Sequence, residues 1–346
     1  MSASATDMIP TNGADGPLQH GGDLGAARRL FPGAPEPFID LSTGINPNPY
    51  PLPRLSSGLF ARLPDPAAVE ALAAVAARAY GAPSPAHVVL APGTQILLPL
   101  VAGLAPASRA VILAPTYPEY PRAAMSAGHH VTIRHKLDEC AEAALVITAN
   151  PNNPDGRVFP RDRLLALAKD LRRCGGLLVV DEAFMDVGPP GASLAGDVSC
   201  GNVVVLRSFG KFFGLAGMRL GFALAAPTLA MQLRARLGPW AVSGPALAVG
   251  VKALADAAWA ELARGRLAKA AKRLDAILTR SGLGIVGGTT LFRLAQAPAA
   301  GVLFRKLGRA GIFVRAFPEN ATWLRFGLPP NERAWRRLGG ALPSSQ

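Results

Sequence analysis

One lysine carries the chemistry that this sequence suggests most strongly. Lys211 follows Ser208 by three residues and precedes Arg219 by eight, in a segment that holds four glycines. Gly210 and the neighbouring aromatic residues let the backbone approach and keep water away, which favours the neutral, nucleophilic amine. Such a lysine can form a Schiff base with an aldehyde. The serine hydroxyl and the arginine fork suit a phosphate. Pyridoxal phosphate, an aldehyde that carries a phosphate, would use both.

The segment 207–222 resembles the lysine signature of the aspartate-aminotransferase superfamily, whose members use pyridoxal phosphate. That signature is Ser-x-x-Lys, a Gly-Leu-Ala-Gly run, and Arg-x-Gly before Tyr or Phe. An ordinary basic loop would explain one lysine and one arginine, but not the placed serine and glycines. The resemblance implies an α/β enzyme of fold type I. Its large domain has a mostly parallel seven-stranded sheet, and its smaller C-terminal domain is α+β.

Two segments that follow predicted strands match the superfamily's cofactor loops. Gly93, Thr94 and Gln95 open a helical run, where backbone amides and the threonine hydroxyl would hold a phosphate. As a bare motif, Pro-Gly-Thr is also an ordinary turn. Tyr117 matches the aromatic residue that stacks on the pyridine ring. Alternatively, it is a tyrosine of the core or of an interface.

Two further segments match the residues that contact the cofactor ring. Asn153, in an Asn-Pro-Asn-Asn-Pro-Asp-Gly loop, would donate to the ring oxygen, although Asp155 replaces the usual threonine. Asp181 ends a buried strand and would pair with the pyridine nitrogen, which makes the ring an electron sink. An acid there could instead cap a helix. Phe184 stands where aminotransferases usually carry tyrosine.

The ends of the chain resemble the branch of L-threonine O-3-phosphate decarboxylases, which is similar to histidinol-phosphate aminotransferases. A substrate with a carboxylate and a phosphate needs two anion sites, which two arginines on neighbouring strands would supply. The resemblance implies catalysis by Lys211 and Asp181, and a substrate site formed by His20, Gly21, Asn46, Asn153, Arg315 and Arg325. His20 and Asn46, taken singly, are equally compatible with structural roles.

The resemblance implies a lyase that converts L-threonine O-3-phosphate to (R)-1-amino-2-propanol O-2-phosphate in cobalamin biosynthesis. The alternative is a histidinol-phosphate aminotransferase or a related aminotransferase. A non-catalytic regulator on this fold is disfavoured, because Lys211, Asp181 and Arg325 are all present. Two positions depart from the superfamily pattern. Leu63 stands where a tyrosine often reaches the partner subunit's cofactor, and Gly210 replaces Ser or Thr, so we expect modestly weaker cofactor binding.

The composition indicates which classes of ligand and partner the protein can bind. The chain has 346 residues, half of them apolar, and 36 Lys and Arg against 23 Asp and Glu give a net charge of +13. The charge fits small anionic substrates, and the absence of zinc-finger spacing, an RNA-recognition signature or a basic arm disfavours nucleic acid. Three unpaired cysteines favour a reducing cytoplasm. Proline, glycine and arginine interrupt the apolar segment 88–114, so we expect no membrane span. We assign no metal ligands, and we expect a homodimer from the resemblance.

Short apolar runs that alternate with helical stretches must position these residues. The pattern predicts seven strands of a doubly covered sheet, at 87–91, 109–113, 129–134, 144–149, 176–180, 202–206 and 219–224. Asp65 and Pro66 begin a helix that runs to Tyr80. Later strands are expected at 290–294, 311–315 and 322–327. We therefore divide the chain into a disordered tail (1–19), a substrate-binding arm (20–54), a large domain (55–226) and a small domain (227–346).

Overall fold

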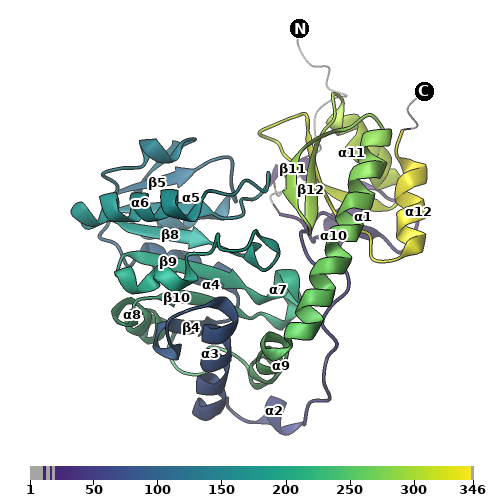
Figure 1. Ribbon diagram of the computed structural model, residues 1–346. Coiled ribbons are helices and arrows are strands. Elements are labelled where there is room, and N and C mark those ends of the chain that lie inside the picture. Colours follow the sequence, from purple (N-terminus) through teal and green to yellow (C-terminus); the bar gives the residue numbers. More distant parts are fainter. Residues whose placement is uncertain (1–10, 13–15, 18–19, 344–346) are drawn as a thin grey trace. The chain divides into compact units, whose positions relative to one another are not determined.

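The computed structural model describes residues 11–12, 16–17 and 20–343 (Figure 1). The chain forms two compact units, Pro49–Glu261 and the combination of Met1–Asn48 with Leu262–Gln346. Most of the expected tail, 1–19, lies outside the described residues. Within it, β1 (Thr11–Asn12) and β2 (Gly16–Pro17) pair as a short antiparallel ladder.

The unit Pro49–Glu261, called the large unit below, is built on a seven-stranded sheet. All seven strands lie where the sequence predicts them, within one or two residues at each end. The order is β4-β10-β9-β8-β7-β5-β6, and only β10 is antiparallel to its neighbours. The strands are β4 (Val88–Ala91), β5 (Arg109–Leu113), β6 (His130–Arg134), β7 (Leu145–Ala149), β8 (Leu177–Asp181), β9 (Val203–Ser208) and β10 (Gly221–Ala225).

Helices between the strands cover this sheet, since parallel strands need crossover connections (Figure 1). The helix α3 has the predicted bounds: Asp65 accepts a hydrogen bond from the Ala67 amide at its start, and Gly81 ends it in the left-handed conformation at φ 76°. The helices of this unit are α2 (Gly58–Ala61), α3 (Pro66–Tyr80), α4 (Thr94–Ala102), α5 (Glu119–Ser126), α6 (Arg161–Arg173), α7 (Phe209–Phe212), α8 (Pro227–Leu237) and α9 (Gly244–Ala255).

The second unit, called the small unit below, has a five-stranded sheet in the order β11-β12-β14-β13-β3. The sequence predicts β12, β13 and β14, but it misses β3 and β11. The strands are β3 (Ile39–Leu41), β11 (Gly284–Thr289), β12 (Phe292–Gln296), β13 (Ile312–Ala316) and β14 (Trp323–Gly327). The helices α1 (Leu24–Leu30), α11 (Ala300–Arg309) and α12 (Glu332–Ala341) belong to this unit, and α10 (Ala257–Arg280) contains the boundary between the units.

The observed division differs from the four segments expected. The expected arm, 20–54, is not a separate segment, because β3 pairs in parallel with β13 of the small sheet and the residues from Pro49 onward belong to the large unit. The boundary falls at Glu261, not near residue 227, because Ala230 and Leu233 of α8 are buried in the large unit's core with β4 and β10. Among the described residues, no helix is long and apolar enough to cross a membrane.

Candidate active site

Three neighbouring strands bring the predicted phosphate ligands together in the large unit. Gly221, the first residue of β10, pairs with Ala91 at the end of β4 and with Ser208 at the end of β9. The segment that follows Ala91 therefore lies close to Arg219, which precedes Gly221 by two residues. Both lie beyond the same ends of these three strands. The sequence predicts from two separate motifs that these residues bind one phosphate: one motif contains Thr94, and the other contains Ser208 and Arg219.

Two glycines there allow Arg219 and the start of α4 to pack closely against the backbone. Gly93 has φ +90°, and a Cβ built on it would lie 2.6 Å from Arg219 Nη2. A Cβ on Gly221 would lie 2.7 Å from the Thr94 amide nitrogen. Thr94 is the first residue of α4, so the helix presents unpaired amides and the positive end of its dipole at this point. The arrangement fits a phosphate held by amides, a hydroxyl and a guanidinium.

Asp181, at the end of β8, is a buried carboxylate held in a fixed orientation. It accepts hydrogen bonds from the Tyr120 hydroxyl at 2.8 Å and from the Ala183 amide at 2.9 Å. Burial raises the pKa of Asp181, while these two hydrogen bonds and the charge of Lys211 act in the opposite direction. The sequence analysis missed Tyr120, which lies in the first turn of α5, three residues after Tyr117.

Lys211 lies in α7, the short helix that follows β9. It is half-buried, and its Nζ lies 5.8 Å from the centroid of the Phe184 ring. Gly210 packs so closely that a Cβ built on it would lie 2.7 Å from the Ala216 Cα. The departure from Ser or Thr at this position thus has a steric reason. The Phe184 ring therefore lies on one side of the amine.

The other predicted cofactor residues lie in two loops beside this cluster. The Tyr117 hydroxyl donates to Gln95 Oε1 at 3.1 Å, so the two side chains are joined. In the second loop, Asn153 is half-buried, and its neighbour Asn152 makes the contacts that fix the loop. Asn152 Nδ2 donates to Asp155 Oδ1 and to the Pro115 carbonyl, both at 2.8 Å. Asp155, which replaces the threonine expected from the family pattern, therefore closes the loop.

In the small unit, Arg315 of β13 and Arg325 of β14 are directly paired in register. Paired residues of antiparallel strands project from the same face, so two positive charges are adjacent. Arg325 is buried, its Nη2 donates to the Ser42 carbonyl at 2.8 Å, and its guanidinium lies over the Phe292 ring. Burial, and then the charge of Arg315, lower the pKa of Arg325 to about 9. The pair suits an anionic ligand.

The predicted substrate residues of the small unit fall into two groups. His20 and Gly21 line a small cavity together with Arg315 and Ser42. Asn46 is not among the residues of that cavity: it lines a different pocket, beside Leu267 and Trp335, and accepts a hydrogen bond from the Asn48 amide at 2.9 Å. Three of the five predicted residues, His20, Gly21 and Arg315, thus line one cavity, and Arg325 is paired with Arg315 in register. Asn46 instead lines another pocket and makes a local hydrogen bond.

Residues 38–335 match the family described as aminotransferase class I and II. The chain belongs to this family. A threonine-phosphate decarboxylase of Sinorhizobium is 45% identical over 94% of this chain and 98% of its own length. A second one, of Pseudomonas aeruginosa, is 41% identical over 94% and 97%. A histidinol-phosphate aminotransferase of Symbiobacterium thermophilum is 34% identical over 66% of this chain and 65% of its own length.

Solved structures of the family confirm the fold. A histidinol-phosphate aminotransferase of Sinorhizobium meliloti, in complex with pyridoxal-5'-phosphate, has a TM-score of 0.78 at 23% identity and covers 92% of this chain and 93% of that one. L-threonine-O-3-phosphate decarboxylase of Porphyromonas gingivalis has a TM-score of 0.72 at 19% identity, over 88% and 98%. The predicted α/β fold with a seven-stranded, mostly parallel sheet is confirmed.

Proposed function

We propose that this protein uses pyridoxal phosphate to decarboxylate L-threonine O-3-phosphate, giving (R)-1-amino-2-propanol O-2-phosphate for cobalamin biosynthesis. The relatives that match nearly the whole chain are threonine-phosphate decarboxylases, while the histidinol-phosphate aminotransferase matches two thirds of it. The structural observation that carries the proposal is the register pair of Arg315 and Arg325. Two adjacent guanidinium groups suit a substrate that carries both a carboxylate and a phosphate.

The residues of the large unit fit the cofactor. Gly93, Thr94, Gln95, Ser208 and Arg219 would hold its phosphate, since Thr94 and Gln95 begin α4 and Arg219 packs against Gly93. In a separate set, Tyr117 and Asn153 would contact the ring, Asp181 would hold its nitrogen, and Lys211 would bind its aldehyde carbon. When bound, pyridoxal phosphate supplies an electron sink for the bond that breaks at the substrate Cα.

The protein's own groups decide which bond breaks and where the proton goes. Asp181 is a carboxylate fixed by Tyr120 and Ala183, so it can keep a proton on a ring nitrogen beside it. His20, Gly21 and Arg315 would bind the substrate phosphate, and Arg325 would orient the carboxylate that leaves as carbon dioxide. Lys211 Nζ would then deliver a proton to Cα, which completes the reaction without an acceptor.

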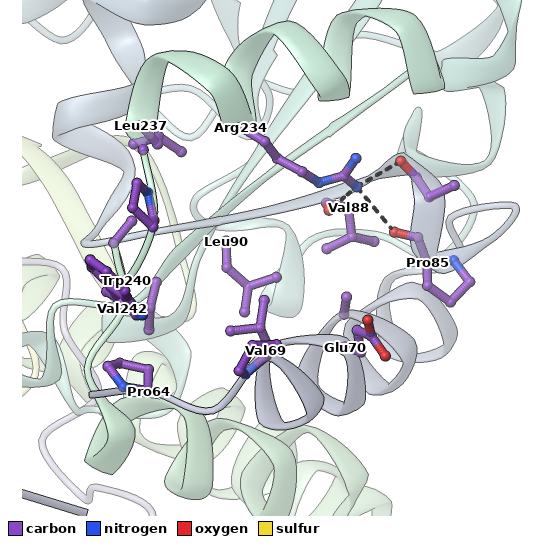
Figure 2. A pocket seen from close by; sticks show the side chains of 16 residues that line it. Pro64, Val69, Glu70, Pro85, Val88, Leu90, Arg234, Leu237, Trp240 and Val242 are labelled. Atoms are coloured by element: carbon purple, nitrogen blue, oxygen red, sulfur yellow. Dashed lines mark hydrogen bonds between the residues drawn. The ribbon is translucent and has the colours of Figure 1, made fainter. Parts of the chain in front are cut away.

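We also propose that the protein is a cytoplasmic homodimer. Phe60, Leu63 and Trp240 are large apolar side chains that are exposed by 69%, 67% and 57%. Trp240 lines an apolar pocket of about 580 Å³ together with Pro64 and Leu90 (Figure 2). Such surface is typical of protein contacts. Sedimentation of the holoenzyme tests the dimer, and a monomer at micromolar concentration would contradict it.

Incubation of the purified protein with L-threonine O-3-phosphate tests the function directly. We expect release of carbon dioxide without any 2-oxo acid, and a yellow protein whose visible band is lost in Lys211→Ala. Arg309→Met, an exposed change in the small unit, serves as the control and should keep full activity. Turnover of histidinol phosphate with 2-oxoglutarate, in the absence of carbon dioxide release, would select the aminotransferase instead.

A further inference from the structure

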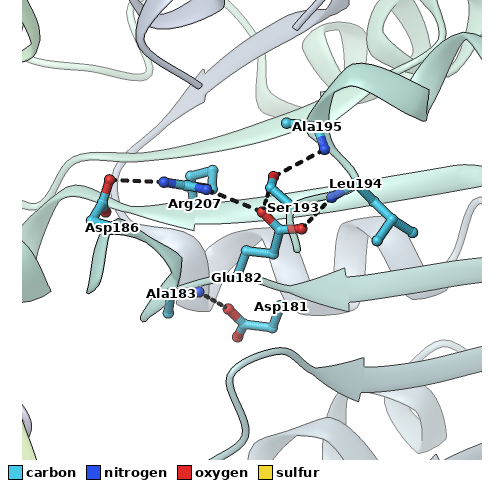
Figure 3. A network of polar contacts seen from close by, with 8 residues as sticks. All are labelled: Asp181, Glu182, Ala183, Asp186, Ser193, Leu194, Ala195 and Arg207. Atoms are coloured by element: carbon cyan, nitrogen blue, oxygen red, sulfur yellow. Dashed lines mark hydrogen bonds and ion pairs between the residues drawn. The ribbon is translucent and has the colours of Figure 1, made fainter. Parts of the chain in front are cut away.

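A buried ionic network lies directly behind the candidate cofactor site (Figure 3). Arg207 of β9 donates through Nη1 to Glu182 at 3.0 Å and through Nη2 to Asp186 at 2.7 Å. All three side chains are less than a tenth exposed. Glu182 also accepts hydrogen bonds from the Ser193 hydroxyl at 2.6 Å and the Leu194 amide at 2.7 Å. The network therefore joins the ends of β8 and β9 with the loop between them.

Stability alone gives little reason for such a network. Burial raises the pKa of Glu182, so the charged form that pairs with Arg207 is held at a cost. The pair of charges could be replaced by apolar side chains at little or no cost in stability. Two carboxylates also share one guanidinium here, which leaves the three groups with a net negative charge. These groups also enforce a local geometry.

Arg207 holds both ends of the short turn 182–186, and this arrangement is called the clamp below. A single guanidinium holds both Glu182 and Asp186, which lie four residues apart. Between them lie Ala183, whose amide donates to the Asp181 carboxylate, and Phe184, whose ring faces Lys211 Nζ. The same turn is closed by a hydrogen bond of 2.9 Å from the Met185 amide to the Glu182 carbonyl. The Ala183 amide and the Phe184 ring, which contact Asp181 and Lys211, therefore lie between two residues that Arg207 holds.

Arg207 also belongs to the segment that carries the lysine. It precedes Ser208 directly and Lys211 by four residues, and Leu206 accepts a hydrogen bond of 2.9 Å from the Glu182 amide. We propose that Arg207, Glu182 and Asp186 are positioning residues, which hold Asp181, Phe184 and Lys211 in the arrangement that binds pyridoxal phosphate. This inference rests on the proposed function, because it concerns the same cofactor. None of the three side chains needs to touch the cofactor itself.

Substitution of Asp186 can distinguish an effect on the arrangement of the cofactor residues from a general loss of folding. Asp186→Ala removes one end of the clamp but leaves the pair of Arg207 with Glu182, so one positive and one negative charge remain in the core. Asp186→Asn keeps an acceptor oxygen for Arg207. We expect Asp186→Ala to weaken binding of pyridoxal phosphate about tenfold, as the loss of an orienting partner commonly does. It should also shift the pH at which the visible band of the bound cofactor titrates, whereas Asp186→Asn should stay close to wild type.

A matched control and a cofactor-free readout complete the experiment. Asp197→Ala removes the partner of Arg161 in an exposed ion pair of the same unit and should change neither quantity. In cofactor-free protein, amide exchange at 183–188 should accelerate in Asp186→Ala only. Equal cofactor affinity, titration and exchange in Asp186→Ala and Asp186→Asn would overturn the clamp and leave the proposed function intact. A wild-type protein that binds no pyridoxal phosphate would overturn both.

Discussion

Arg325 carries a charge that the ligand-free protein disfavours. Burial and the neighbouring Arg315 lower its pKa to about 9, so the unfolded chain binds this proton more tightly than the folded protein does. At neutral pH both states are protonated, and the full penalty opposes folding. The penalty shrinks as the pH rises above about 9, where the folded protein releases the proton first. An anionic ligand would relieve the same penalty by pairing with the guanidinium.

We therefore predict that Arg325→Met stabilises the ligand-free protein at pH 7 while it abolishes decarboxylation. The expected gain is about 1–2 kcal/mol, because an apolar side chain replaces a buried charge. Thermal unfolding of both proteins measures it, with Arg309→Met, an exposed change in the same unit, as the control. The gain should diminish at pH 10, which lies above the pKa of the wild-type arginine, so that most of its proton has been released. A lower melting temperature for Arg325→Met would contradict the prediction.

The turn from β9 into α7 requires glycine at position 210, because neighbouring atoms leave no room there for a side chain. A Cβ on Gly210 would meet the backbone of Ala216, which cannot move without shifting the short helix Ala216–Met218 that leads into Arg219. Gly210→Ser should therefore cost about 1–3 kcal/mol of stability, as overpacking does. It should also weaken cofactor binding, because Lys211 and Arg219 would be displaced.

Gly217→Ser provides the matched control for that change. Gly217 lies in the same short helix, and a Cβ built on it meets no atom within 4 Å. We expect its melting temperature and its affinity for pyridoxal phosphate to match wild type. If Gly210→Ser behaves like Gly217→Ser, the steric account of this turn is wrong.

Elements with a strong local signal were predictable, and those that depend on distant partners were not. Continuous apolar runs identified all seven strands of the large sheet, and Asp65 with Pro66 fixed the start of α3. Strand β3 was missed because it has three residues and pairs with a strand far along the chain. Tyr120 was missed for a similar reason, since its hydrogen bond to Asp181 spans 61 residues. The sequence motifs identified the residue types of the site. The contacts that hold those residues in place could be identified only from the three-dimensional fold.

At the scale of the whole molecule, the predicted residues divide between the two units. The cofactor residues all belong to Pro49–Glu261, whereas His20, Gly21, Arg315 and Arg325 belong to the small unit. Binding of each ligand should therefore stabilise a different set of elements. A ligand present at about 100 times its dissociation constant stabilises the state that binds it by about 2.7 kcal/mol. The effect should be measurable by amide hydrogen exchange, which reports each element separately.

We predict that pyridoxal phosphate slows exchange at 91–95 and 208–221, since these segments contain the phosphate ligands. Inorganic phosphate, added to the cofactor-saturated protein, should then slow exchange at 39–43 and 312–327, around the two arginines. The double change Arg315→Met with Arg325→Met should remove the second protection and leave the first, because the substituted residues lie only in the small unit. If phosphate still slows exchange in this variant, the anion binds elsewhere. The proposal that the two arginines bind the substrate would then be wrong.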